Sequence, residues 1–190
     1  IKALTWTDGT LWGIPIDIYP APAWCNLTLF EEAGLPTAKE LGTSGWTWEY
    51  AMEAMKKLTR STSGDETPTQ WGIGDAWKLI SYNIAVKQAG GGLFDRDVDP
   101  TKATIADPRT LAGFDWVYEI YRQQLNAADY EEAFEKGLAG ITFTGPTWIG
   151  VLNRVANFSW DIMPPLRGPD NDGSYIAVNS LQMSSYTREA

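Results

Sequence analysis

The sequence predicts an α/β fold in which helices pack on a sheet in layers. The chain has 190 residues, enough to bury the core of one ordinary domain. Short apolar runs typical of strands alternate with longer segments of helical periodicity, which is the pattern of layered α/β domains. We therefore expect a single domain with a mainly parallel sheet that includes some antiparallel pairs.

The first predicted elements are a strand and a short helix. Residues 11–19 alternate apolar and polar side chains around Gly13 and Pro15. Because proline cannot donate to a central ladder, this strand is expected at a sheet edge or as a crossing between lobes. Residues 28–33 predict a helix that Gly34 ends, and a loop rich in Thr, Gly and Ser follows.

The middle of the chain predicts two helices around a short buried strand. Thr47 caps the first helix, whose apolar residues recur at spacings of three and four and are expected in the core. These residues are Trp48, Met52, Met55 and either Leu58 or Thr59. Residues 71–74 predict the strand, and Asp75 caps a helix over 76–89 that the glycines at 90–92 end.

Asp107 and Pro108 begin the most clearly marked helix, because Asp is a favoured N-cap and Pro is favoured at the first helical position. One apolar stripe of this helix is expected to face the core. It consists of Leu111, Phe114, Val117, Tyr118, Tyr121 and Leu125. The remaining expected elements are helices over 130–136 and 149–155 and strands over 140–144, 160–163 and 175–178.

Charge and composition exclude several classes of function. There are 15 Lys and Arg against 24 Asp and Glu, with no His and a net charge of -9. Such a chain lacks the basic surface that nucleic acids and bare anionic membranes require. With Cys25 as the only cysteine, the usual zinc ligand sets, Ser-His-Asp and Cys-His catalytic systems and an internal disulfide cannot be built. We expect no metal and no cofactor.

Two motifs resemble ion or phosphate sites but depart from them. Residues 95–99 place three aspartates at alternate positions, as a calcium loop does, but Pro100 stands where that loop needs glycine and Ala106 where it needs glutamate. We interpret the segment as a solvated turn. The glycines at 90–92 follow a helix instead of beginning one, so we interpret them as a helix end and not a phosphate site.

Paired carboxylates are a catalytic arrangement that the composition leaves open, since glycoside hydrolysis needs only two acids across the scissile bond. Most acids are expected in helix caps or on polar helix faces, where the helix dipole and solvent account for them. They are Asp75, Asp107, Glu31, Glu32, Glu53, Glu131 and Glu132. A carbohydrate-active enzyme therefore stays as an alternative interpretation.

Aromatic residues are unusually abundant, with 10 Trp, 8 Tyr and 6 Phe making up 13% of the chain. Trp offers a flat surface for the apolar face of a sugar or for a cation. Trp48, Trp116 and Trp160 occupy periodic or strand positions and are expected in the core. Trp77 and Trp148 each begin a helix just after a strand, where open α/β sheets bind ligands. For these two, ligand contact and core packing are equally expected.

Both ends predict an excised piece of a longer protein. The chain opens at Ile1 without Met, a basic segment or an apolar run, so it shows no secretory signal and no membrane span. Thr187 caps the first turn of a helix that is not completed.

Motifs along nearly the whole chain resemble one known family. Residues 13–17 and 24–36 are similar to the hinge strand and following helix of the extracellular solute-binding proteins of family 1, the substrate receptors of bacterial ABC importers for sugars. Later landmarks match in the same order, at 47–49, 89–91, 107–108, 134–137, 145–148 and 175–183. Two positions depart from the family: Cys25 replaces a usual tyrosine, and Thr147 stands where an aromatic often follows Gly-Pro.

The resemblance implies a type II periplasmic-binding-protein fold, in which two lobes close on a ligand. Each lobe has three layers around a mixed, mainly parallel sheet. Residues 1–190 are then a single lobe with hinge strands near 12–19 and 175–183, and the other lobe is largely absent.

Carried over position by position, the resemblance implies ligand contacts from Asp17, Tyr19, Trp77, Lys78, Thr147, Trp148 and Asn179. Polar side chains hold sugar hydroxyls while rings stack on aromatic residues. Hydrogen bonding within the hinge explains Asp17 and Asn179 equally well. The departure at Thr147 leaves open which of Thr147 and Trp148 faces the cleft.

The resemblance implies a non-enzymatic, monomeric carbohydrate receptor outside the cytoplasm, extracellular or periplasmic and associated with the cell surface. Its partners are a mono- or oligosaccharide and the permease subunits of an ABC transporter. Contact with the membrane is through the permease or a lipid anchor outside this segment, and no nucleic acid is involved. The alternatives are the enzyme module and a receptor for a non-sugar solute such as a polyamine or sugar phosphate.

Overall fold

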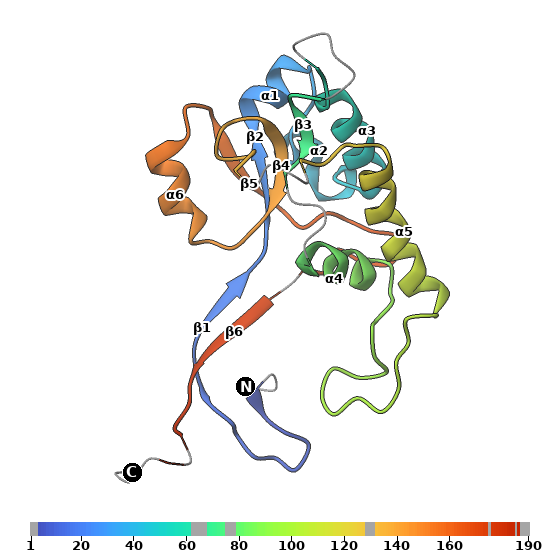
Figure 1. Cartoon of the computed structure of the whole chain (residues 1–190), viewed down its shortest axis with the longest axis vertical. Coiled ribbons are helices and arrows are strands. Elements are labelled where there is room, and N and C mark those ends of the chain that lie inside the picture. The colour runs from blue at the N-terminus through green and yellow to red at the C-terminus, as the bar shows by residue number, and fades with distance from the viewer. Residues whose placement is uncertain are drawn as a thin grey trace.

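The computed structural model describes residues 4–61, 68–74, 79–127, 132–174, 176–184 and 186. The elements in chain order are β1 (Ile14–Pro20), β2 (Ala23–Asn26), α1 (Leu27–Glu32), α2 (Ala38–Gly45), α3 (Trp48–Leu58), β3 (Trp71–Ile73), α4 (Leu79–Gln88), α5 (Pro108–Arg122), β4 (Ala139–Phe143), α6 (Trp148–Val155), β5 (Trp160–Met163) and β6 (Ile176–Leu181). Figure 1 shows β1 and β6 extending together from a body that the other elements form.

The body is organised by a four-stranded sheet of order β3-β4-β2-β5. β3 pairs with β4 in parallel, whereas β2 runs antiparallel to β4 on one side and to β5 on the other. It follows that β3, β4 and β5 point the same way and β2 alone points against them. The expected mixed sheet is confirmed, but the expectation that it is mainly parallel is wrong, because β2 makes two of the three neighbouring pairs antiparallel.

The central strand β2 was not among the elements expected from the sequence. All four of its residues are buried, so it lacks the alternation of polar and apolar side chains that marks a half-buried strand. Its side chains enter different cores: Ala23 and Cys25 belong to one hydrophobic cluster and Trp24 to a second. Residues of α1, α3, α4 and α5 share the first cluster, and α6 contributes to the second. Helices therefore cover both faces of the sheet, as a three-layer arrangement requires.

Several helix ends agree with the sequence. The hydroxyl of Thr47 accepts a hydrogen bond from the amide of Tyr50 at the start of α3, and the carboxylate of Asp107 accepts one from the amide of Arg109 at the start of α5. Gly34 follows α1 with φ of 62°, a left-handed conformation that favours glycine. The expected strands at 71–74, 140–144 and 160–163 are present as β3, β4 and β5.

Two expectations about connecting segments are wrong. The loop expected after α1 contains α2, which is kinked at Gly42, where φ is 69° and ψ is 172°. Glu40 supports its start by accepting hydrogen bonds from the amide and hydroxyl of Thr37. The helix expected over 130–136 is not formed in its described part, because residues 132–137 make turns that end at Gly137.

The inward face of α5 is also different from the expected stripe. Leu111, Tyr118 and Tyr121 are 44%, 59% and 55% exposed. The buried positions are Thr110, Gly113, Val117 and Ile120. A Cβ at Gly113 would meet the backbone of Val86 in α4, so small residues face inward because the two helices lie very close.

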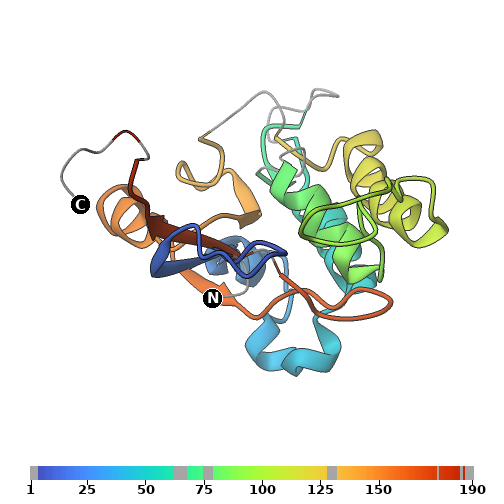
Figure 2. The same cartoon turned by 90° about the horizontal axis from the view of Figure 1, so that it is seen from below.

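β1 and β6 pair antiparallel and form a separate two-stranded sheet, here called the ribbon. This confirms the strand predicted from 11–19 and, in its described residues, that from 175–178. Viewed from below, the ribbon passes between α6 on one side and α4 on the other (Figure 2). Other expectations lie outside the described residues: the cap at Asp75, the first turn of its helix, residue 175 and the cap at Thr187.

Candidate functional site

One face of the ribbon carries polar side chains. Asp17 lies directly opposite Asn179, and the side-chain amide of Asn179 donates a hydrogen bond of 2.7 Å to Oδ1 of Asp17. Both residues are exposed. Because side chains two residues apart in a strand share a face, Tyr19 lies on this same face, as does Ala177 opposite it. We call this surface, formed by Asp17, Tyr19, Ala177 and Asn179, the polar face.

Tyr19 joins the ribbon to the loop between β4 and α6. Its hydroxyl and Oγ1 of Thr147 lie 2.6 Å apart, and either atom can donate. The ring of Tyr19 covers Gly145, where an added Cβ would overlap the ring atoms. Glycine at 145 is therefore required for this approach, and the sequence signal for it was the Gly-Pro pair at 145–146.

The loop that carries Thr147 is fixed from inside the body. The indole N–H of Trp24 in β2 donates to the carbonyl of Thr144 at 2.8 Å. Trp24 is fully buried, and its ring lies 5.5 Å from that of Trp160, centroid to centroid. Sequence reasoning did not assign Trp24 a role, because β2 itself was not recognised.

Thr147 and Trp148 point to different surroundings. Thr147 is exposed and bonds to Tyr19, whereas Trp148 is half-buried and packs on the second cluster, with its ring 6.3 Å from that of Phe134. The structure therefore brings Thr147 to the polar face, whereas Trp148 packs against the second cluster and remains partly exposed. Trp77 and Lys78 lie outside the described residues, between β3 and α4.

The other tryptophans expected in the core have packing partners. Trp48 is 6% exposed and stacks on Trp116 with ring centroids 4.7 Å apart. Its indole N–H donates to the side-chain oxygen of Gln88 at 2.7 Å. Trp116 and Trp160 are partly buried against the first and second clusters.

The aspartate-rich segment at 95–99 holds its own loop together. Asp95 accepts hydrogen bonds from the hydroxyl and amide of Thr101 and from the amide of Lys102, and these bonds lower the pKa of its carboxyl to about 2. Arg96 pairs with Asp99. Among the described residues, no three His, Cys, Asp or Glu side chains come together as a metal site.

Hydrogen bonds from neighbouring groups lower the pKa of seven carboxyl groups, those of Asp8, Glu40, Glu53, Asp95, Asp107, Glu119 and Glu132. A lowered pKa favours the charged form, whereas a general acid at neutral pH needs a raised pKa. The lowered pKa values of these carboxyl groups are explained by their contacts in loops, in helix caps and on the surface.

The fold places the chain among the α/β proteins of the periplasmic-binding-protein type. The family model for the bacterial extracellular solute-binding protein matches residues 1–190, and the chain belongs to that family. No curated protein sequence matches the chain. Within the part of the chain that is described, none of the helices has the length and apolar character needed to cross a bilayer.

Solved structures share the fold at low sequence identity. An ABC substrate-binding protein from Listeria monocytogenes in complex with cycloalternan has a TM-score of 0.79 and 21% identity, over 98% of this chain and 47% of that chain. The GacH receptor of Streptomyces glaucescens, solved unliganded and with acarbose, has a TM-score of 0.77 and 15% identity, over 99% and 48%. A sugar transporter from Arthrobacter chlorophenolicus with bound laminaribiose has a TM-score of 0.71 and 20% identity, over 100% and 47%. The chain spans about half the length of these proteins.

Proposed function

We propose that residues 1–190 form one ligand-holding lobe of a two-lobed carbohydrate receptor, which delivers its solute to the permease of a bacterial ABC importer. Three observations support the proposal: the family, the solved structures with bound sugars, and the match to only about half of each of those chains. The ribbon then serves as the connection between lobes, because its two strands extend together from the body (Figure 1).

The polar face is the observation that carries the sugar-binding role. The carboxylate of Asp17 accepts hydrogen bonds and the amide of Asn179 both donates and accepts, which suits the hydroxyls of a sugar. The hydroxyls of Tyr19 and Thr147 form one hydrogen bond with each other. Each hydroxyl can form a further hydrogen bond with a ligand. The face is solvent-accessible and is held by the Gly145 contact, so its groups are placed before the ligand arrives.

The proposed site also includes residues beyond the ribbon. Trp77 and Trp148 are proposed as stacking surfaces for sugar rings, and Lys78 as a donor to hydroxyls. Holding a sugar in this way requires no nucleophile, so we propose a non-enzymatic, monomeric receptor. Its proposed location is outside the cytoplasm, in keeping with an extracellular family.

A thermal-shift screen of the intact protein tests this function. The probes are monosaccharides, maltotetraose, laminaribiose, cycloalternan, polyols and polyamines, with product analysis of each sample that is stabilised. A ligand at a hundredfold its Kd adds about 2.7 kcal/mol of stability. A sugar that stabilises and is recovered unchanged supports the receptor. Cleavage of the sugar would show an enzyme, and stabilisation by polyamines alone would show a cation receptor.

Single substitutions then locate the site. With the sugar found in the screen, Trp77→Ala is expected to weaken binding by about 1–3 kcal/mol if the ring stacks on the sugar. Trp148→Ala is expected to weaken binding by a similar amount. Trp148→Phe keeps an aromatic ring at this position, so it distinguishes loss of stacking on the sugar from loss of the packing against Phe134. The matched control is Tyr118→Ala, because Tyr118 is an exposed aromatic residue of α5. Unchanged affinity in both tryptophan variants would remove these residues from the site.

A further inference from the structure

A side chain holds the carbonyl of Thr144 at a point where the backbone ladder of the sheet cannot. Thr144 directly follows β4, and β2 pairs antiparallel with β4 in a register that places Ala23 opposite Phe143. Continued by one position, this register places Pro22 opposite Thr144. Because proline has no N–H, it offers no donor there. The indole N–H of Trp24 donates to the Thr144 carbonyl instead, at 2.8 Å.

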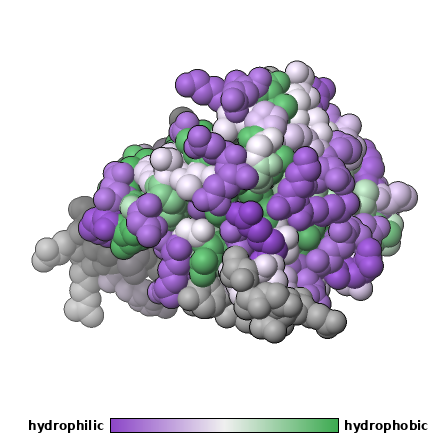
Figure 3. Space-filling model, turned by 90° about the horizontal axis from the view of Figure 1, so that it is seen from above, coloured by the Kyte–Doolittle hydropathy of each residue, from purple (hydrophilic) through white to green (hydrophobic). Residues whose placement is uncertain are grey.

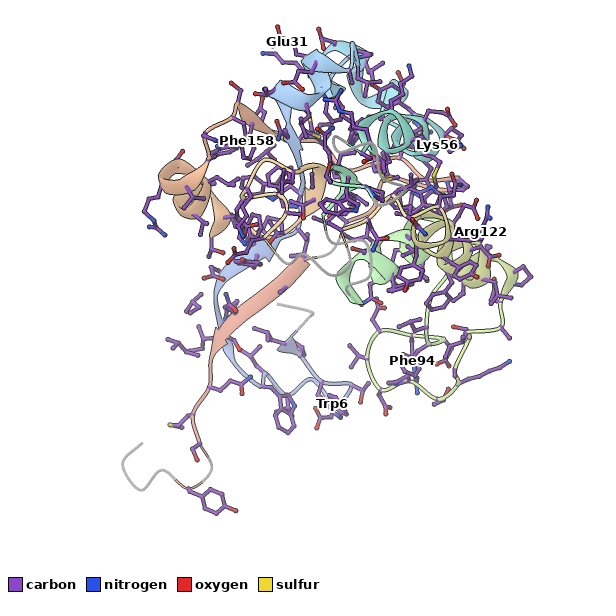
Figure 4. The ribbon with its side chains drawn as sticks, turned by 45° about the horizontal axis from the view of Figure 1, so that its top comes forward. Trp6, Glu31, Lys56, Phe94, Arg122 and Phe158 are labelled. Atoms are coloured by element: carbon purple, nitrogen blue, oxygen red, sulfur yellow. The ribbon has the colours of Figure 1, made fainter. Side chains whose placement is uncertain are left out.

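The packing of Trp24 fixes the direction in which its indole N–H points. The side chain is fully buried in the second cluster together with Leu152 of α6, and a ring enclosed in a close-packed core keeps one orientation. Figure 4 shows Phe158, which packs against this cluster, on the side of the body where α6 lies. Lys56 of α3 and Arg122 of α5 lie on the other side.

A short turn connects the held carbonyl to the polar face. Only the Gly-Pro pair at 145–146 separates Thr144 from Thr147. Backbone amides of the first two residues of α6 donate to the two carbonyls of this pair, at 3.2 and 3.1 Å. Thr147 stands at the N-cap of α6, but its side chain makes no capping bond there and meets the hydroxyl of Tyr19. A shift of the Thr144 carbonyl therefore moves Thr147 relative to Tyr19.

Trp24 itself is out of reach of a ligand. Its exposed fraction is 0%, and the body that encloses it presents a largely hydrophilic surface with scattered apolar residues when seen from above (Figure 3). The polar face lies on the ribbon, outside this body. Any influence of Trp24 on that face therefore passes through the turn at 145–146.

We infer that Trp24 is a positioning residue of the polar face. Its indole N–H holds the turn so that Thr147 meets Tyr19, and in this way it raises the affinity of the face for a sugar. The effect on affinity rests on the carbohydrate receptor proposed above. Groups that are held in place before binding lose less conformational entropy when the ligand arrives.

Urea unfolding of the intact protein, without sugar, tests the positioning. Trp24→Phe removes the indole N–H and keeps a buried ring. Trp46→Phe is the matched control, because Trp46 is 1% exposed in the first cluster and its indole N–H has no partner among the described residues. Tyr19→Phe alone is expected to lower the unfolding midpoint through an about two- to tenfold change in the unfolding equilibrium constant.

The change caused by Tyr19→Phe is then measured in both tryptophan variants. We expect it to be unaltered beside Trp46→Phe and to fall below about twofold beside Trp24→Phe, since the turn no longer holds Thr147 against Tyr19. Equal changes in the two backgrounds would overturn the inference.

Solvent exchange of the Trp24 indole N–H, followed by NMR, is a second measurement that needs no substitution in the core. Because coupling between two groups is reciprocal, Tyr19→Phe should speed this exchange by about two- to tenfold relative to exchange at the Trp46 indole. An unchanged ratio of the two exchange rates would also overturn the inference.

The consequence for binding is measured by calorimetry with laminaribiose, maltotetraose and cycloalternan. Trp24→Phe is expected to raise Kd by about three- to tenfold, as loss of one well-placed hydrogen bond predicts, and Trp46→Phe to leave Kd within about twofold. If Trp24→Phe binds as tightly as the unsubstituted protein, the inference is wrong and the receptor stands. If the unsubstituted protein binds none of these sugars, that result counts against the proposed function, and the two sugar-free experiments still decide whether Trp24 positions Thr147.

Discussion

The strands β1 and β2 are separated by only two residues and have opposite surroundings. β2 lies between β4 and β5, helices cover both of its faces, and all four of its residues are buried. β1 has β6 as its neighbour, and the isoleucines at 14, 16 and 18 are 65%, 57% and 66% exposed. β1 is no less apolar than β2, so the difference comes from what covers each strand and not from the side chains themselves.

Removing a large side chain from β2 is expected to have the largest effect. Trp24→Ala should lower the free energy of unfolding by about 3–5 kcal/mol, because it leaves a cavity in the second cluster and removes the bond to Thr144. Trp12→Ala is the matched control, because Trp12 is 64% exposed. This replacement should lower the free energy of unfolding by less than about 0.5 kcal/mol. Urea unfolding followed by near-UV circular dichroism measures both. Similar losses would mean that Trp12 is as well packed as Trp24.

A smaller difference in stability is expected between two helical glycines, one tightly packed and one with open space around it. Gly113→Ala should destabilise the protein by about 1–3 kcal/mol, since its new Cβ meets the Val86 backbone. Gly150 in α6 has open space around it, so Gly150→Ala should stabilise by up to about 1 kcal/mol through helix propensity. Melting temperatures should therefore move in opposite directions, and a shift of the same sign would contradict the close packing of α4 and α5.

The contact of the ribbon with the body is expected to contribute less. Tyr19→Phe and Thr147→Val each remove one hydroxyl of the 2.6 Å bond, and each should cost about 0.5–1.5 kcal/mol. A double-mutant cycle in urea should give a coupling energy of at least about 0.5 kcal/mol. Additive losses would show that the two hydroxyls do not interact in solution.

The smallest expected effect is a local response to acid in the loop at 95–102. Because hydrogen bonds lower the pKa of Asp95 to about 2, its contribution is complete above the unfolded pKa of about 3.9 and is lost as the pH falls through about 2. NMR shifts of the Thr101 and Lys102 amides in the folded protein should therefore change around pH 2, where Asp95 takes up its proton. Asp95→Asn should abolish this pH-dependent change in the amide shifts. If the change persists in the variant, it arises from the titration of another group.

The sequence was informative where one local interaction determines a structure. Thr47, Asp107 and Gly34 mark helix ends through their own side chains or backbone conformation, and the structure confirms each. It was uninformative where burial on all sides removes the periodic pattern. β2 is the clearest case, because a strand with four buried residues shows no alternation.

Predictions about α5 failed for a related reason. Hydrophobicity predicts the stripe of Leu111, Tyr118 and Tyr121, but the close approach of α4 selects the face with Gly113. The distance between two helices depends on tertiary packing, so the periodicity of one helix does not predict it. In the candidate site, the sequence placed Asp17, Tyr19 and Asn179 on strands that the structure pairs, yet their sharing of one face depends on the register of β1 with β6.

The position of β2 in the sheet also constrains the order of folding. Trp24 bonds to Thr144, which is 120 residues later in the chain, and β2 cannot be enclosed until β4 and β5 have both been made. Closing so long a loop is slow. β2 thus remains without its two neighbouring strands until residues 139–163 have been synthesised.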